Sequence, residues 1–171
     1  MNDSHEIVVN LATLREVTLL TNLLELYAHD ISDAFALDLG SDGRFGYKDL
    51  GLYWSEPGRR YPFLIRQAQQ VLGFTLITRQ ASVSAGNENL DVAEFFVLRR
   101  HRRLGVGRRA AFLVWNRFSA HWTVRVSLGN RTGLDFWESV IAEYTCGMQR
   151  VTTVPGNPHG WRVFSFDTTA P

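Results

Sequence analysis

The sequence has one cysteine and no hydrophobic run of membrane-spanning length, and each scarcity excludes a class of protein. Because Cys146 is the only cysteine, neither an intramolecular disulfide nor a cysteine-based zinc cluster can form. The first residues are polar and acidic, unlike the basic and then apolar start of a secretory signal. We therefore expect a cytoplasmic protein that does not enter a membrane.

Several motifs of cofactor and metal chemistry are also missing. His29, His101, His121 and His159 fit no metal-ligand spacing, so we expect no metal site. The chain has neither the P-loop pattern Gly-x-x-x-x-Gly-Lys-Ser/Thr nor the three spaced glycines of a dinucleotide-binding turn. Repeats, linkers and low-complexity tracts are absent, and 171 residues fit a single domain over 1–171.

Basic residues are concentrated in one segment. All of the 18 basic residues except Lys48 are arginines, and six of these lie between residues 99 and 109. The formal net charge is only +1, so this cluster is a local feature. A solvated loop and a patch that binds RNA or DNA are both alternatives for such a cluster. The lack of interleaved aromatic and basic residues disfavours nucleic acid as a partner.

The arginines surround a turn with a recognisable chemistry. An apolar strand ends at residues 95–97, the pattern Arg102-x-x-Gly105-x-Gly107 follows, and an amphipathic helix begins there. Glycines let an anionic ligand approach the backbone. A turn that opens a helix also presents N–H groups without intrahelical acceptors, at the positive end of the helix dipole. The segment therefore predicts a phosphate-binding cradle.

With its flanking strand and helix, this turn resembles the acyl-CoA pyrophosphate loop of the GNAT N-acetyltransferase superfamily, and the resemblance extends from Thr13 to Asp167. It implies acetyl-CoA as cosubstrate and direct acetyl transfer, in a ternary complex, to a primary amine of a small molecule or peptide. It also implies that the strand and the turn contact the cofactor, through Phe95, Phe96, Val97, Arg102, Arg103, Leu104, Gly105, Val106, Gly107 and Arg108.

The same resemblance implies two further residues at the cofactor, Asn130 and Trp137. Asn130 resembles the family's asparagine that hydrogen-bonds the pantetheine region, and a helix cap is compatible with the same residue. Trp137 falls where the family usually has a general-acid tyrosine, and an indole N–H does not exchange a proton at neutral pH. Arg125 stands where some relatives hold a glutamate base. A GNAT-like domain that binds CoA without turnover is therefore an alternative to an enzyme.

Glu94 is our candidate for the catalytic base. A carboxylate within an apolar strand has either a partner or a raised pKa, and both conditions mark a candidate site. A buried salt bridge with a neighbouring arginine is an equal alternative. Asp91 is the reserve base, and Tyr144 or Tyr27 is a substitute for the missing acid.

The acceptor is expected to contact the segment from residue 30 to residue 60. This segment is rich in aspartate and suits a cationic amine, with Tyr47, Tyr53 and Trp54 as candidate walls. A purely structural role is favoured for any one of these residues. The sequence leaves open which amine is the acceptor and whether the protein forms a homodimer.

Hydrophobic periodicity predicts a mixed α/β chain. Strands are expected at 7–9, 61–67, 71–80, 90–98, 123–128, 148–154 and 161–166, and helices at 14–28, from 102 or 103 to 120, and at 132–142. Residues 30–60 and 82–89 are expected to be mostly loop. This order is the one that the resemblance implies for a mostly antiparallel central sheet of six to seven strands flanked by helices.

Overall fold

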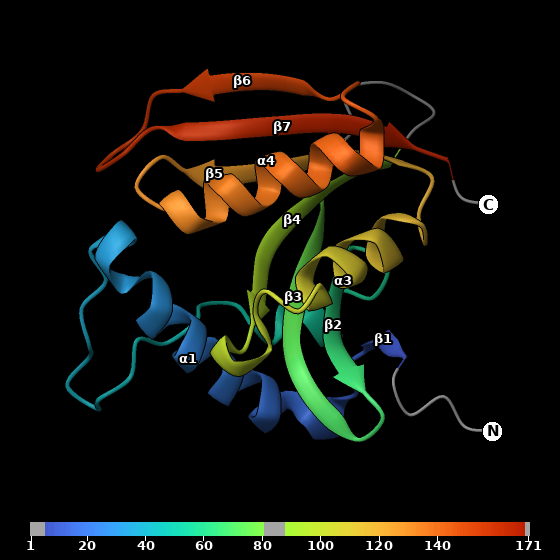
Figure 1. Ribbon diagram of the computed structural model, residues 1–171. Helices are drawn as coiled ribbons and strands as arrows, with labels where there is room; N and C mark the ends of the chain where they lie inside the picture. The colour runs from blue at the N-terminus through green and yellow to red at the C-terminus, as the bar shows by residue number, and fades with distance from the viewer. Residues whose placement is uncertain (1–5, 81–87, 170–171) are drawn as a thin grey trace.

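Seven strands form one sheet in the computed structural model, which describes residues 6–80 and 88–169 (Figure 1). Their order across the sheet is β1-β2-β3-β4-β5-β7-β6, and only the β4–β5 pair is parallel. The expectation of a mixed, mostly antiparallel sheet is confirmed. The strands are β1 (Ile7–Leu11), β2 (Arg60–Gln67), β3 (Gln70–Gln80), β4 (Glu88–Val97), β5 (Ala120–Ser127), β6 (Arg150–Val154) and β7 (Trp161–Thr168).

Helices cover both faces of this sheet and divide the apolar side chains into two cores. On one face, α1 (Val17–Phe35) and α2 (Leu52–Ser55) pack on β2, β3 and β4. On the other, α3 (Val106–Trp115) and α4 (Arg131–Thr145) lie in front of the sheet in Figure 1. Two short 3₁₀ turns, η1 (Leu14–Glu16) and η2 (Arg99–His101), precede α1 and α3.

Strand β3 is apolar on both faces because both faces are covered. Phe74 and Leu76 belong to the core beneath α1, whereas Leu72 and Ile77 belong to the core beneath α3 and α4. All four side chains are almost completely buried. The two-sided apolar pattern thus identified a central strand.

All three predicted helices differ in extent from the sequence prediction: α4 continues past residue 142 to Thr145, and α3 ends at Trp115 rather than at residue 120. Helix α1 continues to Phe35, whose ring lies 5.7 Å from that of Trp161 on β7, a tertiary contact with no signature in the local sequence. Helix α3 begins only at Val106, because Arg103 (φ +59°) and Gly105 (φ +77°) both adopt left-handed backbone conformations. The loop predicted at 82–89 falls mainly on residues 81–87, outside the described residues, and its last two residues already belong to β4.

Glu16 fastens the start of the α1 segment to the sheet. Its carboxylate accepts the Thr13 N–H (2.8 Å) and the Thr13 hydroxyl (2.9 Å), and Arg66 on β2 donates to its other oxygen (2.5 Å). The Thr13 N–H is the main cause, followed by Arg66, of a Glu16 pKa lowered to about 2. This carboxylate is therefore more strongly stabilised when charged in the folded protein than in the unfolded chain.

Glu16→Gln should lower the free energy of unfolding by about 1–2 kcal/mol at pH 7, because the charged acceptor of three hydrogen bonds is lost. Since the folded pKa lies below the unfolded one, the contribution is complete above the ordinary glutamate pKa and disappears as the pH falls toward 2. Urea unfolding from pH 7 to pH 2 measures this difference. Glu6→Gln is the control, because Glu6 is exposed. A difference between wild type and Glu16→Gln that stays constant with pH would contradict the assignment.

Candidate active site

The two parallel strands at the centre of the sheet separate halfway along their length. Residues 88–92 of β4 pair with residues 120–124 of β5, and beyond this point β4 pairs only with β3 and β5 only with β7. Figure 1 shows β4 turning away from β5 toward the lower half of the molecule. The end of β4 is thus left with one bare edge.

A β-bulge sits where the strands part. Leu76 pairs with Glu94 and Ile77 with Val92, so Ala93 is an extra residue in β4. Before the bulge Val92 faces the α3–α4 core, and after it Phe95 faces the same core. An extra residue of this kind shifts the alternation by one position. Asp91 and Glu94 therefore point to the same face of the sheet, toward α1 and α2.

The turn after β4 carries a row of unsatisfied backbone donors. None of the six N–H groups from Arg103 to Arg108 donates a hydrogen bond to another described residue, and the first such bond of α3 runs from the Arg109 N–H to the Gly105 carbonyl (3.0 Å). The left-handed conformations at Arg103 and Gly105 curl the backbone before the helix. Consecutive free amides at a helix start form an anion site.

The two glycines of the turn have different reasons to lack side chains. Gly105 has φ +77°, and a β-carbon there would meet no atom within 4 Å, so its missing side chain leaves open space beside the free amides. A β-carbon at Gly107 would lie 3.0 Å from two ring carbons of Phe136 on α4. Gly107 therefore permits close packing of α3 on α4, and its bare side faces protein.

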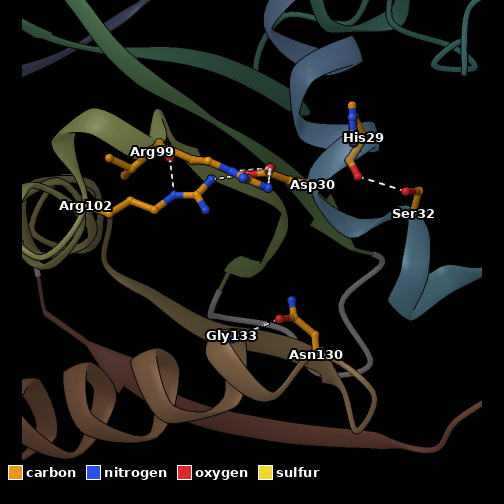
Figure 2. Close-up of polar contacts among 8 residues, drawn as sticks. His29, Asp30, Ser32, Arg99, Arg102, Asn130 and Gly133 are labelled. Carbon is orange, nitrogen blue, oxygen red and sulfur yellow. Dashed lines mark hydrogen bonds and ion pairs between the residues drawn. The ribbon is translucent and has the colours of Figure 1, made fainter.

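Three of the six arginines already have carboxylate partners. Figure 2 shows Arg99 and Arg102 reaching Asp30 on α1, with 2.7 Å between Arg99 and Asp30. Arg102 also donates from Nε to the Val97 carbonyl (2.7 Å), and Arg108 forms a two-pronged pair with Glu143 on α4. Two of the expected phosphate contacts, Arg102 and Arg108, are therefore bound to protein carboxylates in this structure.

The other arginines of the segment keep their charge available. Arg100, Arg103 and Arg109 are exposed and form no ion pair within the parts of the chain that the structure describes. Of these only Arg103 was expected at the cofactor, and the spacing of residues did not single out the other two. Half of the basic cluster is thus neutralised locally, which further weakens the nucleic-acid alternative.

The remaining residues of the strand and turn contribute mainly backbone. Phe96 and Val97 are buried in opposite cores, and Phe95 stacks on Phe136 with 5.8 Å between ring centroids. Val106 is buried, whereas the Leu104 side chain is 67% exposed. The Val97 carbonyl is occupied by Arg102, so the bare edge of β4 offers its polar groups before that residue.

Asn130 directly precedes α4, and Trp137 lies on the first half of this helix. Asn130 caps this helix, since its side-chain oxygen accepts the Gly133 N–H at 2.9 Å (Figure 2). Trp137 is only 8% exposed, and its ring packs against Phe95 at 5.0 Å between centroids. The helix-cap reading of Asn130 is confirmed, and the indole occupies the apolar core beside the end of β4.

Glu94 lies among phenols rather than arginines. The Tyr47 hydroxyl donates to its Oε1 at 3.1 Å, and no described residue forms a salt bridge with it. Burial raises the pKa of Glu94, against the opposing effects of Tyr27 and Tyr47. The buried ion pair considered for Glu94 is found at Asp91 instead, whose carboxylate is 2% exposed and binds Arg125 at 2.7 and 3.3 Å.

The phenols of this cluster come from three separate segments. Burial raises the pKa of Tyr27 and Tyr47, with a further contribution from the Glu94 charge, and raises that of Tyr53 to about 12. The Tyr53 hydroxyl is buried and has no hydrogen-bond partner among the described residues. Tyr144 lies elsewhere, donating to Asn116 (2.7 Å) beside the α3–α4 core, so of the two tyrosines considered as acid only Tyr27 lies beside Glu94.

The architecture is that of a known fold. No family model and no curated protein matches the sequence, but the fold is the one found in GNAT acetyltransferases. The resemblance inferred from the turn is confirmed at the level of the fold.

Three solved structures illustrate the similarity. A GNAT-family acetyltransferase from Streptococcus agalactiae has 10% identity and a TM-score of 0.71 over 95% of this chain and 96% of its own. An acetyltransferase from Thermus thermophilus has 14% identity and a TM-score of 0.67 over 95% and 97%. NAA60 from Arabidopsis thaliana, solved in complex with acetyl-CoA, has 12% identity and a TM-score of 0.64 over 95% and 98%.

The described residues contain neither a metal-binding cluster nor a helix that could span a membrane. No group of three or more histidine, cysteine, aspartate or glutamate side chains is placed to hold a metal ion in residues 6–80 and 88–169. No helix in the same ranges is both long and apolar enough to cross a membrane.

Asp30→Asn should destabilise the protein by about 1–3 kcal/mol at pH 7, because the Asp30 carboxylate is only 14% exposed and holds two arginines. Burial raises the pKa of Asp30, but the bonds from Arg102 and Arg99 outweigh this and leave it lowered. The difference from wild type should therefore shrink as the pH falls below the ordinary aspartate value.

The matched control is Glu143→Gln, which breaks the exposed pair with Arg108 and should leave the urea midpoint unchanged. Equal midpoints for wild type and Asp30→Asn would show that the contact between α1 and the turn contributes nothing to folding.

Proposed function

We propose that the protein is an acetyl-CoA-dependent N-acetyltransferase that acts on a primary amine of a small molecule or peptide. The observation that carries this proposal is the row of six unsatisfied N–H groups from Arg103 to Arg108, directly after the bare end of β4. A diphosphate needs several donors and positive charge at one place. The exposed Arg100, Arg103 and Arg109 supply that charge beside the free amides.

The proposal is supported by structures of the same fold with the expected ligands. NAA60 was solved with acetyl-CoA and also with a bisubstrate analogue, and Naa50 from the same plant was solved with a bisubstrate analogue that joins CoA to a peptide. Direct transfer between two bound substrates is therefore our choice of reaction. In this chain the transfer would take place between the separated ends of β4 and β5.

Glu94 is suited to accept the proton of the acceptor amine. An alkyl ammonium with a pKa near 10.4 is almost fully protonated at pH 7, so producing the neutral amine is the demanding step. The raised pKa of the Glu94 carboxyl brings this base closer to neutral pH. Asp91 is a poorer base, because Arg125 already occupies both of its oxygens.

The bound cosubstrate would supply an acetyl thioester. The amine nitrogen would bond to the acetyl carbon as the bond from that carbon to sulfur breaks; Glu94 would take the first proton of the ammonium, and the released thiolate would take the second. A thiolate leaving group has a conjugate acid near pKa 8.5 and needs little protonation at neutral pH. The buried tyrosines beside Glu94 have raised pKa values and stay neutral, so they act as hydrogen-bond donors. Trp137 in place of a tyrosine therefore does not prevent turnover.

The buried indole of Trp137 favours a second candidate function. A domain that binds CoA but does not turn over would keep the free amides of the turn and lose the acid on α4. Release of CoA across a broad panel of amines separates the two, since only an enzyme produces free thiol.

Acetyl-CoA at millimolar concentration should raise the melting temperature, because it binds the folded state alone. Gly105→Val should abolish this shift by placing a branched side chain in the open space beside the amides. Thermal scans with and without acetyl-CoA measure the ligand-induced shift separately from the stability of the variant.

Gly58→Val is the control for backbone strain, since Gly58 has a similar φ of +82° and equally open surroundings. It should melt lower and keep the full shift. A full shift in Gly105→Val would rule out the turn as the binding site.

Glu94→Gln should reduce the rate of thiol release by about 10²–10⁴-fold and leave the thermal shift with acetyl-CoA intact. In wild type, kcat/KM should increase as the pH rises through the raised pKa of Glu94, because only the carboxylate accepts a proton. This rise of kcat/KM with pH should be missing in Glu94→Gln. Glu88→Gln, at the far end of the same strand, should retain the wild-type rate and profile.

A further inference from the structure

A carboxylate on α1 holds the loop that follows this helix. Both oxygens of Glu25 accept backbone N–H groups, from Phe45 at 2.8 Å and from Gly46 at 3.0 Å. Glu25 is half-buried and forms no salt bridge with a described residue. Two charge-assisted hydrogen bonds from adjacent amides fix both the position and the direction of the backbone at this point.

The residue after this anchored dipeptide reaches the proposed base. Gly46 has φ +69°, a turn conformation, and the hydroxyl of the next residue, Tyr47, donates to Glu94 Oε1 at 3.1 Å. Residues 38–48 form neither helix nor strand, so no backbone ladder holds Tyr47 in place. Among the described contacts of this loop, the Glu25 carboxylate is the polar anchor nearest in sequence to Tyr47.

Several other groups face Glu94 and must be separated from the effect of Tyr47. Tyr27 comes from α1, Tyr53 acts from α2, Asp91 lies earlier on β4, and Arg125 comes from β5. Tyr27 is held by ring contacts with Phe74 and Phe96 (5.8 Å each), and Asp91 and Arg125 are bound to each other. The positions of Tyr27, Asp91 and Arg125 are thus set by contacts outside the loop, whereas Tyr53 interacts with Tyr47 itself.

We propose that Glu25 is a positioning residue for Glu94, which acts by holding the backbone of residues 45 and 46 so that the Tyr47 hydroxyl stays hydrogen-bonded to the Glu94 carboxylate. The relevance of this contact for catalysis rests on the proposed function, whereas the contact itself does not. Glu25 touches neither the base nor the proposed acetyl-CoA site.

The contact has a measurable consequence. A phenol that donates to a carboxylate stabilises its charged form, so Tyr47 lowers the pKa of Glu94 relative to burial alone. Loss of the anchor should therefore raise that pKa. A residue that stabilised only the fold would not change it.

The experiment is a double-mutant cycle read by ¹³C NMR titration of the Glu94 carboxyl in the full chain, assigned with Glu94→Gln. Glu25→Ala and Tyr47→Phe should each move the titration midpoint upward by about half a pH unit to one unit. The double variant should titrate like Tyr47→Phe alone, because Glu25 acts only through the tyrosine. Glu25→Gln, which keeps one acceptor oxygen, should lie between wild type and Glu25→Ala and serves if Glu25→Ala does not fold.

Glu143→Ala is the matched control, because Glu143 also uses both oxygens as acceptors and lies on α4. It should leave the midpoint of Glu94 unchanged. The proposal is overturned if the Glu25 variants titrate like wild type, if Tyr47→Phe does not move the midpoint, or if the effects of Glu25→Ala and Tyr47→Phe add.

The titration needs no substrate, so its outcome is independent of turnover. If the protein releases no thiol but the double-mutant cycle gives the expected midpoints, the positioning role of Glu25 is supported and the proposed function is not. If turnover depends on Glu94 but the shifts of the Glu94 midpoint in Glu25→Ala and Tyr47→Phe add, the proposed function is supported and the positioning role is not. In an active enzyme, the acid limb of kcat/KM should move to higher pH equally in Glu25→Ala and Tyr47→Phe.

Discussion

The parting of β4 from β5 is the constraint on which the rest of the site depends. Five residues of each strand are paired, and beyond Val92 and Val124 the two strands no longer pair with each other. The bulge at Ala93 turns Glu94 to the α1 side, and the bare strand end leads into a turn whose amides are also unpaired. Continued pairing of β4 with β5 would have satisfied the backbone groups at the end of β4 and left none of them for a ligand.

The carboxylates around this opening differ in their partners, and the partners determine what each can do. Asp91 is bound by Arg125, Asp30 by Arg99 and Arg102, and Glu94 only by neutral phenols. A carboxylate whose oxygens are both occupied by guanidinium groups has no oxygen free to contact a substrate amine. Glu94 is therefore the member of the group whose environment suits proton transfer.

Helix α1 connects both halves of the site. Through Asp30 it holds the arginines before the turn, and through Glu25 it holds the loop that carries Tyr47. The proposed acetyl-CoA side and the proposed acceptor side thus share one rigid element, which fixes their relative position. In the part of α1 that continues past its apolar periodicity, Asp30 binds these arginines and Phe35 contacts Trp161.

Local patterns in the sequence were enough to predict the order of the seven strands and the three long helices, the central place of β3 and the glycine turn after β4, because periodicity and backbone conformation are local properties. They also made Glu94 a candidate base, which stays a prediction, since a carboxylate in an apolar strand is conspicuous. The tertiary packing alone shows which arginines are neutralised, that Gly107 faces Phe136, and that the Tyr47 hydroxyl reaches the Glu94 carboxylate, 47 residues away. Such pairings depend on how distant segments pack, and the spacing of residues along one segment carries no record of them.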